Sequence, residues 1–180
     1  MKFLDFSFYN IDERYLKTLH SADNKSQYSH DKDYGSKPFL GIVEHESYRY
    51  FIPLSSGKAK HARMNYIGKD YILIYEVINI ASRRPHDIVK PRRDAYLDKI
   101  LSVLNINNMI PVPEGLYRSA AIQGNDLLRK EYEFCFDYKD DIITKANVVY
   151  DITADSKAIE RCCNFNKLEE ICTKYMKQDK

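Results

Sequence analysis

The chain has 180 residues, enough for one domain with a substantial core, and its hydrophobic content of 44% is ordinary for a globular protein. Its net charge of +2 excludes a polybasic protein held to nucleic acid by bulk charge, so any anion site must come from local patches. Fifteen tyrosines and no tryptophan are unusual, and such rings can stack on bases, fill a core or line a protein interface.

The sequence contains no secretory signal and no apolar run long enough to cross a bilayer, so we expect a cytoplasmic protein without a membrane partner. Cysteines stay reduced in that compartment, and we expect four free thiols. Their spacing does not match a zinc site, and none has a visible activating neighbour. We therefore expect no bound metal, no other cofactor and no catalytic thiol. The four cysteines are Cys135, Cys162, Cys163 and Cys172.

The N-terminal part of the chain predicts a strand followed by a helix. Residues 2–10 alternate between apolar and polar side chains, as a strand does. Apolar side chains then recur at helical spacing behind a possible N-cap at Asn10 or Asp12, which predicts a helix of about three turns. Residues 23–37 are polar and contain glycine, so they predict a long loop, and long loops are often functional or disordered.

The next segments predict a β-rich region interrupted by basic loops. Residues 38–56 contain two β-rich runs around the tetrapeptide EHES, which is typical of a hairpin. Residues 71–78, YILIYEVI, are almost continuously apolar and predict a buried central strand. The connecting segments 57–68 and 79–95 are rich in lysine and arginine and predict loops.

Residues 96–113 give conflicting indications. The strand-like end of this segment, NNMIPVP, contains prolines that favour an edge strand or a strand end. The segment before it has apolar residues at helical spacing, so strand and helix both remain open there. Those apolar residues are Leu97, Ile100, Leu101 and Leu104.

The C-terminal third predicts helices. Between about residues 126 and 150 the apolar positions recur at steps of three, four or seven, which predicts one amphipathic helix of about 25 residues. A shorter helix is expected from about residue 164 onwards. Strands precede helices without regular alternation, so residues 1–180 predict a single α+β domain with an antiparallel sheet. The periodic positions are Leu128, Tyr132, Cys135, Ile142, Ala146 and Val149.

The most informative stretch is residues 50–61, YFIPLSSGKAKH. It lacks the glycine and hydroxyl spacing of a nucleotide-binding P-loop and the GxSxG pattern of a serine hydrolase. Two serines, a tight turn and a lysine do suit a phosphodiester, because hydroxyls, backbone N–H groups and an ammonium can all face one phosphate. On these residues alone, an ordinary polar surface turn is the more frequent explanation.

The order of four segments resembles the ToxN/AbiQ family of endoribonuclease toxins from type III toxin–antitoxin systems. The segments are KPFLGIV, YFIPLSSGKAKH, NMIPVP and CNFNKLEE, which together span most of the chain. The resemblance implies a compact, strongly bent antiparallel sheet or barrel with surrounding helices, similar to the MazF/Kid toxins. It also implies metal-independent cleavage of RNA by attack of the 2′-hydroxyl, which leaves 2′,3′-cyclic phosphate and 5′-hydroxyl ends.

The resemblance further implies a partner. The toxin would process its own repetitive antitoxin RNA, a pseudoknot, and would stay inhibited in a closed ring of alternating protein and RNA. Released toxin would cut cellular or phage RNA in abortive infection, and DNA is not expected as a partner. The alternatives are a non-catalytic RNA-binding module that uses the same groove and a tyrosine-rich protein-interaction domain.

The resemblance assigns site residues by their positions in this sequence. Ser55, Ser56 and Lys58 match the hydroxyls and lysine at the strand end, with Ser56 as the proton-relay donor and Lys58 stabilising the phosphorane charge. Tyr34 and Lys37 match a tyrosine and a lysine that precede the first hairpin strand. The remaining candidate is His61, which has an ordinary pKa near neutrality and is either a general base or a structural hydrogen-bonding residue.

Basic side chains in the loops are candidates for RNA binding through phosphates and splayed bases. Charge runs commonly do no more than solvate a surface, and we expect this of several of them. The candidates are Lys60, Arg63, Arg83, Arg84, Lys90, Arg92, Arg93 and Arg118.

Overall fold

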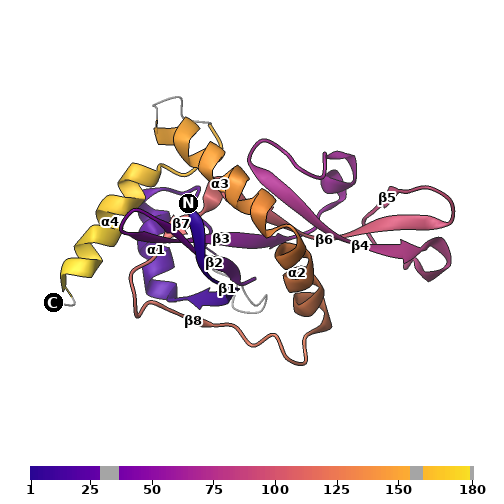
Figure 1. Ribbon diagram of the computed structural model, residues 1–180, viewed down its shortest axis with the longest axis horizontal. Coiled ribbons are helices and arrows are strands. Elements are labelled where there is room, and N and C mark those ends of the chain that lie inside the picture. The colour runs from indigo at the N-terminus through magenta and orange to yellow at the C-terminus, as the bar shows by residue number, and fades with distance from the viewer. Residues whose placement is uncertain (29–36, 155–159, 179–180) are drawn as a thin grey trace.

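The computed structural model describes residues 1–28, 37–154 and 160–178 of the chain (Figure 1). Its centre is an eight-stranded sheet in which every pairing is antiparallel and the main strand order is β4-β6-β3-β2-β1-β8. Two short strands lie off this order, because β5 pairs with β6 and β7 pairs with β3. None of the helices in the described part of the chain is long and apolar enough to cross a membrane.

The predicted first strand is β1, Lys2–Ile11. Its pairing with β2, Phe39–His45, shifts register between Phe3 and Ser7, so β1 contains a bulge. The bulge explains the uneven alternation of its apolar residues, since Phe3 and Phe6 lie three apart and still contact each other with ring centroids at 4.8 Å. On its other edge β1 pairs with the short strand β8, Tyr117–Ser119.

The predicted hairpin is confirmed as β2 and β3, Tyr48–Ser56. The first part of β3 pairs with β2 and with β7, Ile110–Pro111. Its last three residues, Leu54–Ser56, pair with β6, Tyr96–Asn105. β3 therefore joins two parts of the curled sheet, and its C-terminal end lies where they meet.

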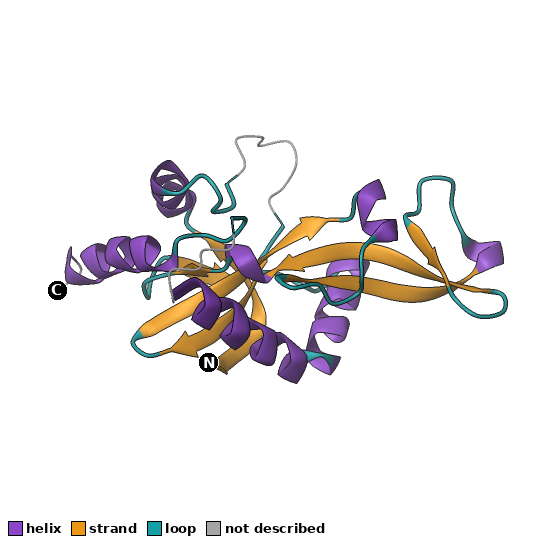
Figure 2. Ribbon diagram, turned by 90° about the horizontal axis from the view of Figure 1, so that it is seen from above, coloured by secondary structure: helices purple, strands orange, loops and turns teal. Residues whose placement is uncertain are grey.

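A long arm extends from the sheet and consists of β4, β5 and β6 (Figure 2). β4 spans Tyr71–Asn79 and β5 spans Val89–Pro91. The prediction of a central strand at 71–78 is wrong, because β4 is the edge of the main strand order: it pairs along its length with β6, and its other side forms an isolated bridge between Ile72 and Ile67. Only its first half is buried, where Ile72, Leu73 and Ile74 point into apolar clusters on both faces.

The conflicting segment is a strand, β6, and its helical spacing comes from a bulge. Ile74 pairs with Ser102 while Tyr75 pairs with Ile100, so Leu101 is an extra residue in the ladder. Beyond a bulge the faces of a strand exchange, and apolar residues three apart then share a face. Leu101 and Leu104 accordingly lie in the main core, whereas Ile100 and Val103 lie in a smaller cluster on the other face. Both faces are covered, which removes the usual alternation.

The short helix after β1 is confirmed as α1, Glu13–Ala22, with Asp12 as its N-cap. The prediction of a single helix between about residues 126 and 150 is wrong in one respect. Two helices occupy its place, α2 at Asp126–Asp137 and α3 at Lys139–Ala154, separated by Tyr138. Backbone bonds from Tyr138 to Phe134 and from Ile142 to Tyr138 keep the helical phase across the break, so the apolar periodicity does not reveal it.

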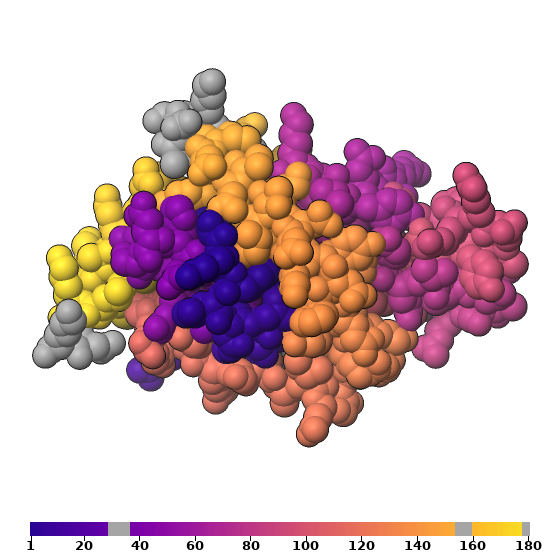
Figure 3. Space-filling model, viewed as in Figure 1, coloured from indigo at the N-terminus to yellow at the C-terminus, as the bar shows by residue number. Residues whose placement is uncertain are grey.

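The C-terminal helix is α4, Phe165–Gln178. It packs against α1, where the rings of Tyr15 and Tyr175 are 5.0 Å apart, and against α3, where the rings of Tyr150 and Phe165 stack. The arm protrudes from the body of the molecule, on whose visible face α2 and α3 lie beside β1 (Figure 3). The predicted α+β class with a strongly bent antiparallel sheet is confirmed, although the sheet curls without closing into a barrel.

The four cysteines are free thiols, as expected, and the structure shows that all four are buried. Burial raises the pKa of Cys135 and Cys163, so their reactive thiolate forms are disfavoured. Among the described residues no group of three or more His, Cys, Asp or Glu side chains is arranged to hold a metal ion.

Candidate active site

The two predicted hydroxyls lie at the C-terminal end of β3. Ser56 is exposed, and Ser55 is half-buried opposite Val103 of β6. The side-chain amide of Asn105 donates to Ser55 Oγ at 3.0 Å and lies 3.4 Å from the carbonyl of Pro53. Asn105 thereby bonds to the residues before and after Leu54. It holds the Ser55 hydroxyl in place, while Ser56 is exposed to solvent.

The chain turns away from β6 at Gly57. A Cβ atom at this position would lie 3.3 Å from the carbonyl oxygen of Ile100, which is closer than ordinary van der Waals contact. Glycine therefore suits the point where β3 leaves the backbone of β6. Lys58 follows as an exposed residue that precedes the 3₁₀ helix Ala59–Arg63, two positions after Ser56.

His61 closes this turn. The backbone N–H of Lys58 donates to His61 Nδ1 at 2.8 Å, and the backbone N–H of His61 donates back to the carbonyl of Lys58 at 2.8 Å. The imidazole is buried, and its pKa is lowered by burial and by the charges of Lys60 and Lys58. An Nδ1 that accepts a backbone hydrogen bond has no lone pair left for a substrate proton, so this geometry favours the structural role.

Lys37 lies directly beside the end of β3. The N–H of Leu54 donates to the carbonyl of Pro38 at 3.3 Å, which places Lys37 next to the Ser55–Ser56 segment. The Lys37 ammonium forms an ion pair with Glu131 of α2, a residue that the sequence reasoning did not single out. Both side chains line an open pocket of about 440 Å³ between β1, α2 and the segment after β8.

A second polar contact ties the segment after α1 to the same place. Gln27 Nε2 donates to the carbonyl of Leu54 at 3.1 Å, so the loop that carries the predicted Tyr34 begins at the site. Tyr34 itself lies outside the described residues. The structure thus brings Lys37, Ser55, Ser56 and Lys58 to one strand end.

The predicted RNA-binding residues divide into two groups. Six are exposed and form no ion pair with another described residue, whereas Lys90 and Arg92 bond to neighbouring groups of the arm and its loops. Lys90 donates to the carbonyl of Met64 and lies 4.3 Å from the centre of the Tyr66 ring. The six are Lys60, Arg63, Arg83, Arg84, Arg93 and Arg118.

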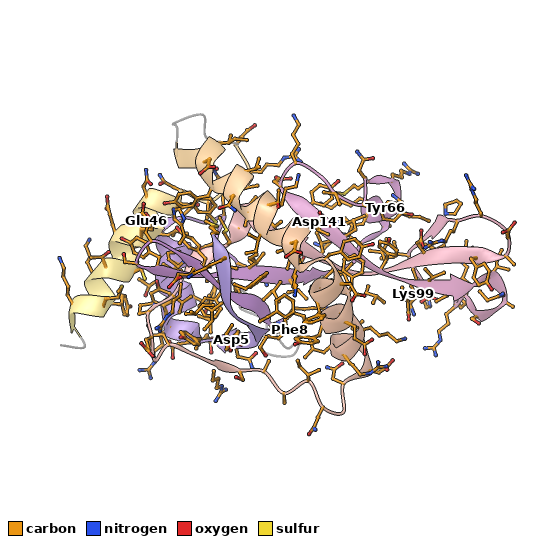
Figure 4. All side chains as sticks on the ribbon, viewed as in Figure 1. Asp5, Phe8, Glu46, Tyr66, Lys99 and Asp141 are labelled. Carbon is orange, nitrogen blue, oxygen red and sulfur yellow. The ribbon has the colours of Figure 1, made fainter. Side chains whose placement is uncertain are left out.

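A buried carboxylate organises the middle of the arm. Asp98 accepts from Arg92 at 2.8 Å and from the Tyr66 hydroxyl at 2.6 Å, and burial together with Asp98 raises the pKa of Tyr66 to about 12. Figure 4 shows Lys99 on β6 of the arm and Tyr66 in the loop that precedes β4. Arg118 is on β8, at the opposite end of the strand order from the arm.

Comparisons with known proteins agree with this architecture. Residues 7–173 match the family described as Toxin ToxN, type III toxin-antitoxin system. The chain is 29% identical over 189 residues to Endoribonuclease ToxN of Bacillus thuringiensis subsp. kurstaki, and the match covers 96% of this chain and 85% of that protein.

Solved structures are similar over almost the whole chain. One, from work on selective toxin inhibition by a non-coding RNA pseudoknot in bacterial type III systems, has a TM-score of 0.72 at 27% identity and covers 95% of this chain and 98% of its own. Another, from work on a processed non-coding RNA that regulates a bacterial antiviral system, has a TM-score of 0.71 at 26% identity and covers 91% and 95%. AbiQ, a lactococcal anti-phage endoribonuclease, shares the fold with a TM-score of 0.70 at 21% identity, over 96% and 98%.

The fold and its relatives define the class as an endoribonuclease toxin, which confirms the predicted type of enzyme. Within that class, the chain belongs to the ToxN family of toxins from type III toxin–antitoxin systems. The family resemblance read from the four sequence segments is thereby confirmed.

Proposed function

We propose that this chain cleaves RNA at the C-terminal end of β3 without a metal ion. The observation that supports the proposal is the convergence of Ser55, Ser56 and Lys58 with Lys37 at one strand end. Two lysines supply positive charge, and two hydroxyls and the turn after Ser56 supply hydrogen-bond donors. A phosphodiester needs both when negative charge grows on its oxygens in the transition state.

The proposed reaction is an internal transesterification. The 2′-oxygen of one nucleotide attacks the adjacent phosphorus, the bond from phosphorus to the 5′-oxygen of the next nucleotide breaks, and a 2′,3′-cyclic phosphate forms. The proton of the 2′-hydroxyl passes to a base, and the departing 5′-oxygen gains a proton and becomes a hydroxyl. Ser56 relays a proton at the scissile phosphate, and Lys58 stabilises the charge on the phosphorane oxygens.

The neighbouring groups assist these two residues. Ser55, held by Asn105, and the Lys37 ammonium add further donors to the phosphate. Tyr34 belongs to the proposal through the family resemblance, as a donor to phosphate or a ring for a base to stack on. His61 keeps the turn closed through the Lys58 backbone.

The biological role follows the relatives. The toxin would process a repetitive antitoxin RNA in the cytoplasm, remain bound to the products in a closed protein–RNA ring, and be inhibited there. Toxin that is free of antitoxin would cut cellular or phage transcripts during abortive infection. The exposed basic residues would hold the RNA backbone, because each neutralised phosphate releases bound counterions.

A single assay tests the proposal. Purified protein is incubated with an antitoxin-like repeat RNA in EDTA, and the ends of any products are analysed. We expect cyclic phosphate ends with the wild type and a loss of at least about a hundredfold in rate with Ser56→Ala or Lys58→Ala. Binding without cleavage would indicate a non-catalytic RNA-binding module. The absence of both binding and cleavage would contradict the proposal as a whole.

A further inference from the structure

Glu131 is a charged residue on the face of α2 that packs against the core, where apolar residues are usual. Its side chain is only 1% exposed, and it accepts a hydrogen bond from the Lys37 ammonium through Oε1. Its second oxygen, Oε2, is buried and has no hydrogen-bond partner among the described residues. A buried carboxylate with an unsatisfied oxygen is costly to fold, so its presence requires a reason.

The surroundings of Glu131 are rigid. It lies between the buried residues Leu128 and Cys135 on α2, a helix whose first turn is capped by the Asn125 side chain. α2 contacts β1, β4 and β6, so the helix is fixed against both parts of the sheet that meet at the end of β3. A carboxylate in this position therefore has little freedom to move.

Lys37, in contrast, enters the site from the end of a loop. Its side chain is 17% exposed, and a lysine has four rotatable side-chain bonds that would otherwise leave its ammonium spread over many positions. The ion pair with Glu131 removes that freedom and fixes the ammonium at a residue whose neighbour, Pro38, is bonded to the end of β3 through the Leu54 N–H. A catalytic charge is effective only when it is held in place before the substrate arrives.

We propose that Glu131 is a positioning residue for the cleavage reaction, acting through the Lys37 ammonium. The inference rests on the proposed function and deepens it, because it explains why a carboxylate is retained at a buried position of α2. Glu131 does not touch the RNA. It holds Lys37 so that the ammonium faces the phosphate that Ser56 and Lys58 bind.

The first test is Glu131→Gln, which keeps the shape and an acceptor oxygen but removes the charge. We expect kcat to fall ten- to hundredfold with KM little changed, because misplacement of a reacting group by about 1 Å can cost a hundredfold in rate. Thermal stability should not fall, since a buried charge has been removed. The matched control is Glu133→Gln on the same helix, where an exposed Glu133 pairs with Arg129, and its kcat should equal that of the wild type.

A double-variant cycle separates positioning from a merely structural role. Lys37→Met should lower kcat by at least about a hundredfold and also lower stability, because it leaves the Glu131 carboxylate buried without its partner. Adding Glu131→Gln should restore stability without restoring kcat and without lowering it further. A further tenfold loss of kcat in the double variant would overturn the inference, since Glu131 would then act independently of Lys37.

A second measurement follows the contact without cleavage. An amine-directed acylating reagent is applied and the modification of each lysine is measured by peptide mass spectrometry. Lys37 should react slowly in the wild type and at least about fivefold faster in Glu131→Gln, while the exposed Lys58 reacts equally in both. Equal rates for Lys37 would overturn the inference.

The outcomes distinguish this inference from the proposed function. If the wild type cleaves, Ser56→Ala is inactive and Glu131→Gln is fully active, only the positioning role fails. If Ser56→Ala and Lys58→Ala both retain wild-type activity, the proposed site fails, and the positioning role fails with it even when the acylation rates confirm the contact.

Discussion

At the scale of single residues, Asn105 connects the two strands that form the site. Its amide donates to Ser55 Oγ at 3.0 Å, and it is contributed by β6 rather than by the strand that carries the serines. We expect Asn105→Ala to free the Ser55 hydroxyl and to lower kcat about tenfold, with a loss of about 1 kcal/mol in the free energy of unfolding. Cleavage rates and chemical denaturation of the same preparation measure the two effects.

Asn107 provides the matched control for this variant. It lies two residues further along and its amide donates to the carbonyl of Arg161 at 2.9 Å, away from the site. Asn107→Ala should therefore lose a similar free energy of unfolding, about 1 kcal/mol, while keeping wild-type cleavage. Equal losses of activity in both variants would mean that Asn105 acts through stability alone.

His61 gives the site a dependence on pH. Burial and two neighbouring lysines lower its pKa below the ordinary value of 6.5, so the folded protein binds this proton less readily than the unfolded chain. Stability from His61 is therefore fully present above pH 6.5 and is lost as pH falls through the lowered pKa. Protonation would also place a hydrogen on Nδ1 and break its bond with the Lys58 N–H.

We expect His61→Asn, which cannot titrate, to flatten the fall of unfolding free energy as pH drops below the ordinary histidine value of 6.5. The measurement is denaturant unfolding at several pH values, with activity followed over the same range. His86→Asn is the control, because His86 is exposed and its replacement should leave the wild-type slope intact. An unchanged slope in His61→Asn would assign the acid sensitivity to another group.

The residues of the site differ in how well the sequence reveals them. Ser55, Ser56 and Lys58 are neighbours in the chain, so their composition alone suits a phosphate. Glu131 meets Lys37 across 94 positions, and Asn105 meets Ser55 across 50. No local pattern encodes such pairs, although a glutamate on the apolar face of a predicted helix, one turn before Cys135, is a visible exception to the amphipathic pattern.

At the scale of elements, the arm depends on Asp98. This buried carboxylate bridges Arg92 of the segment after β5 and the hydroxyl of Tyr66, which belongs to the loop before β4. We expect Asp98→Ala to cost about 2 kcal/mol and Tyr66→Phe about 1 kcal/mol, because the first removes both hydrogen bonds and the second removes one. Chemical denaturation gives both values.

Hydrogen exchange locates the effect. Amides of β4 and β6 should exchange faster in Asp98→Ala, whereas those of β1 and β2 should keep wild-type rates, because the carboxylate lies on β6 and bonds to Tyr66 before β4 and to Arg92 after β5. A uniform increase over all four strands would show that the arm and the body unfold as one unit.

The same elements show where sequence reasoning was incomplete. The helical spacing in β6 arises from the bulge at Leu101 and from apolar cover on both faces, neither of which is visible without the partner strand. The break at Tyr138 keeps the helical phase, so α2 and α3 resemble one helix in periodicity. In contrast, α1 and the hairpin were predictable because a cap and a turn are local features.

At the scale of the whole molecule, exposed positive charge is spread over separate elements. Arg83 and Arg84 follow β4 on the arm, Lys60 and Arg63 lie beside the strand end, and Arg118 lies on β8. Such a distribution suits a long RNA that passes the site and contacts several parts of the surface. It does not suit binding to one compact patch, which agrees with a net charge of only +2.

The salt dependence of RNA binding tests which arginines contact phosphates. For single-stranded RNA each neutralised phosphate contributes about 0.7 to the slope of log affinity against log salt. We expect Arg83→Gln/Arg84→Gln, made in the inactive Ser56→Ala protein, to reduce the slope by about 1.4 and to weaken binding similarly for different sequences. Arg129→Gln is the control, because this exposed arginine of α2 is paired with Asp126 and Glu133 and should leave the slope unchanged. The Ser56→Ala parent, the double arginine variant and the Arg129→Gln control could all show the same salt slope. That result would exclude Arg83 and Arg84 from the RNA path and would restrict the interface to the strand end and its flanking loops.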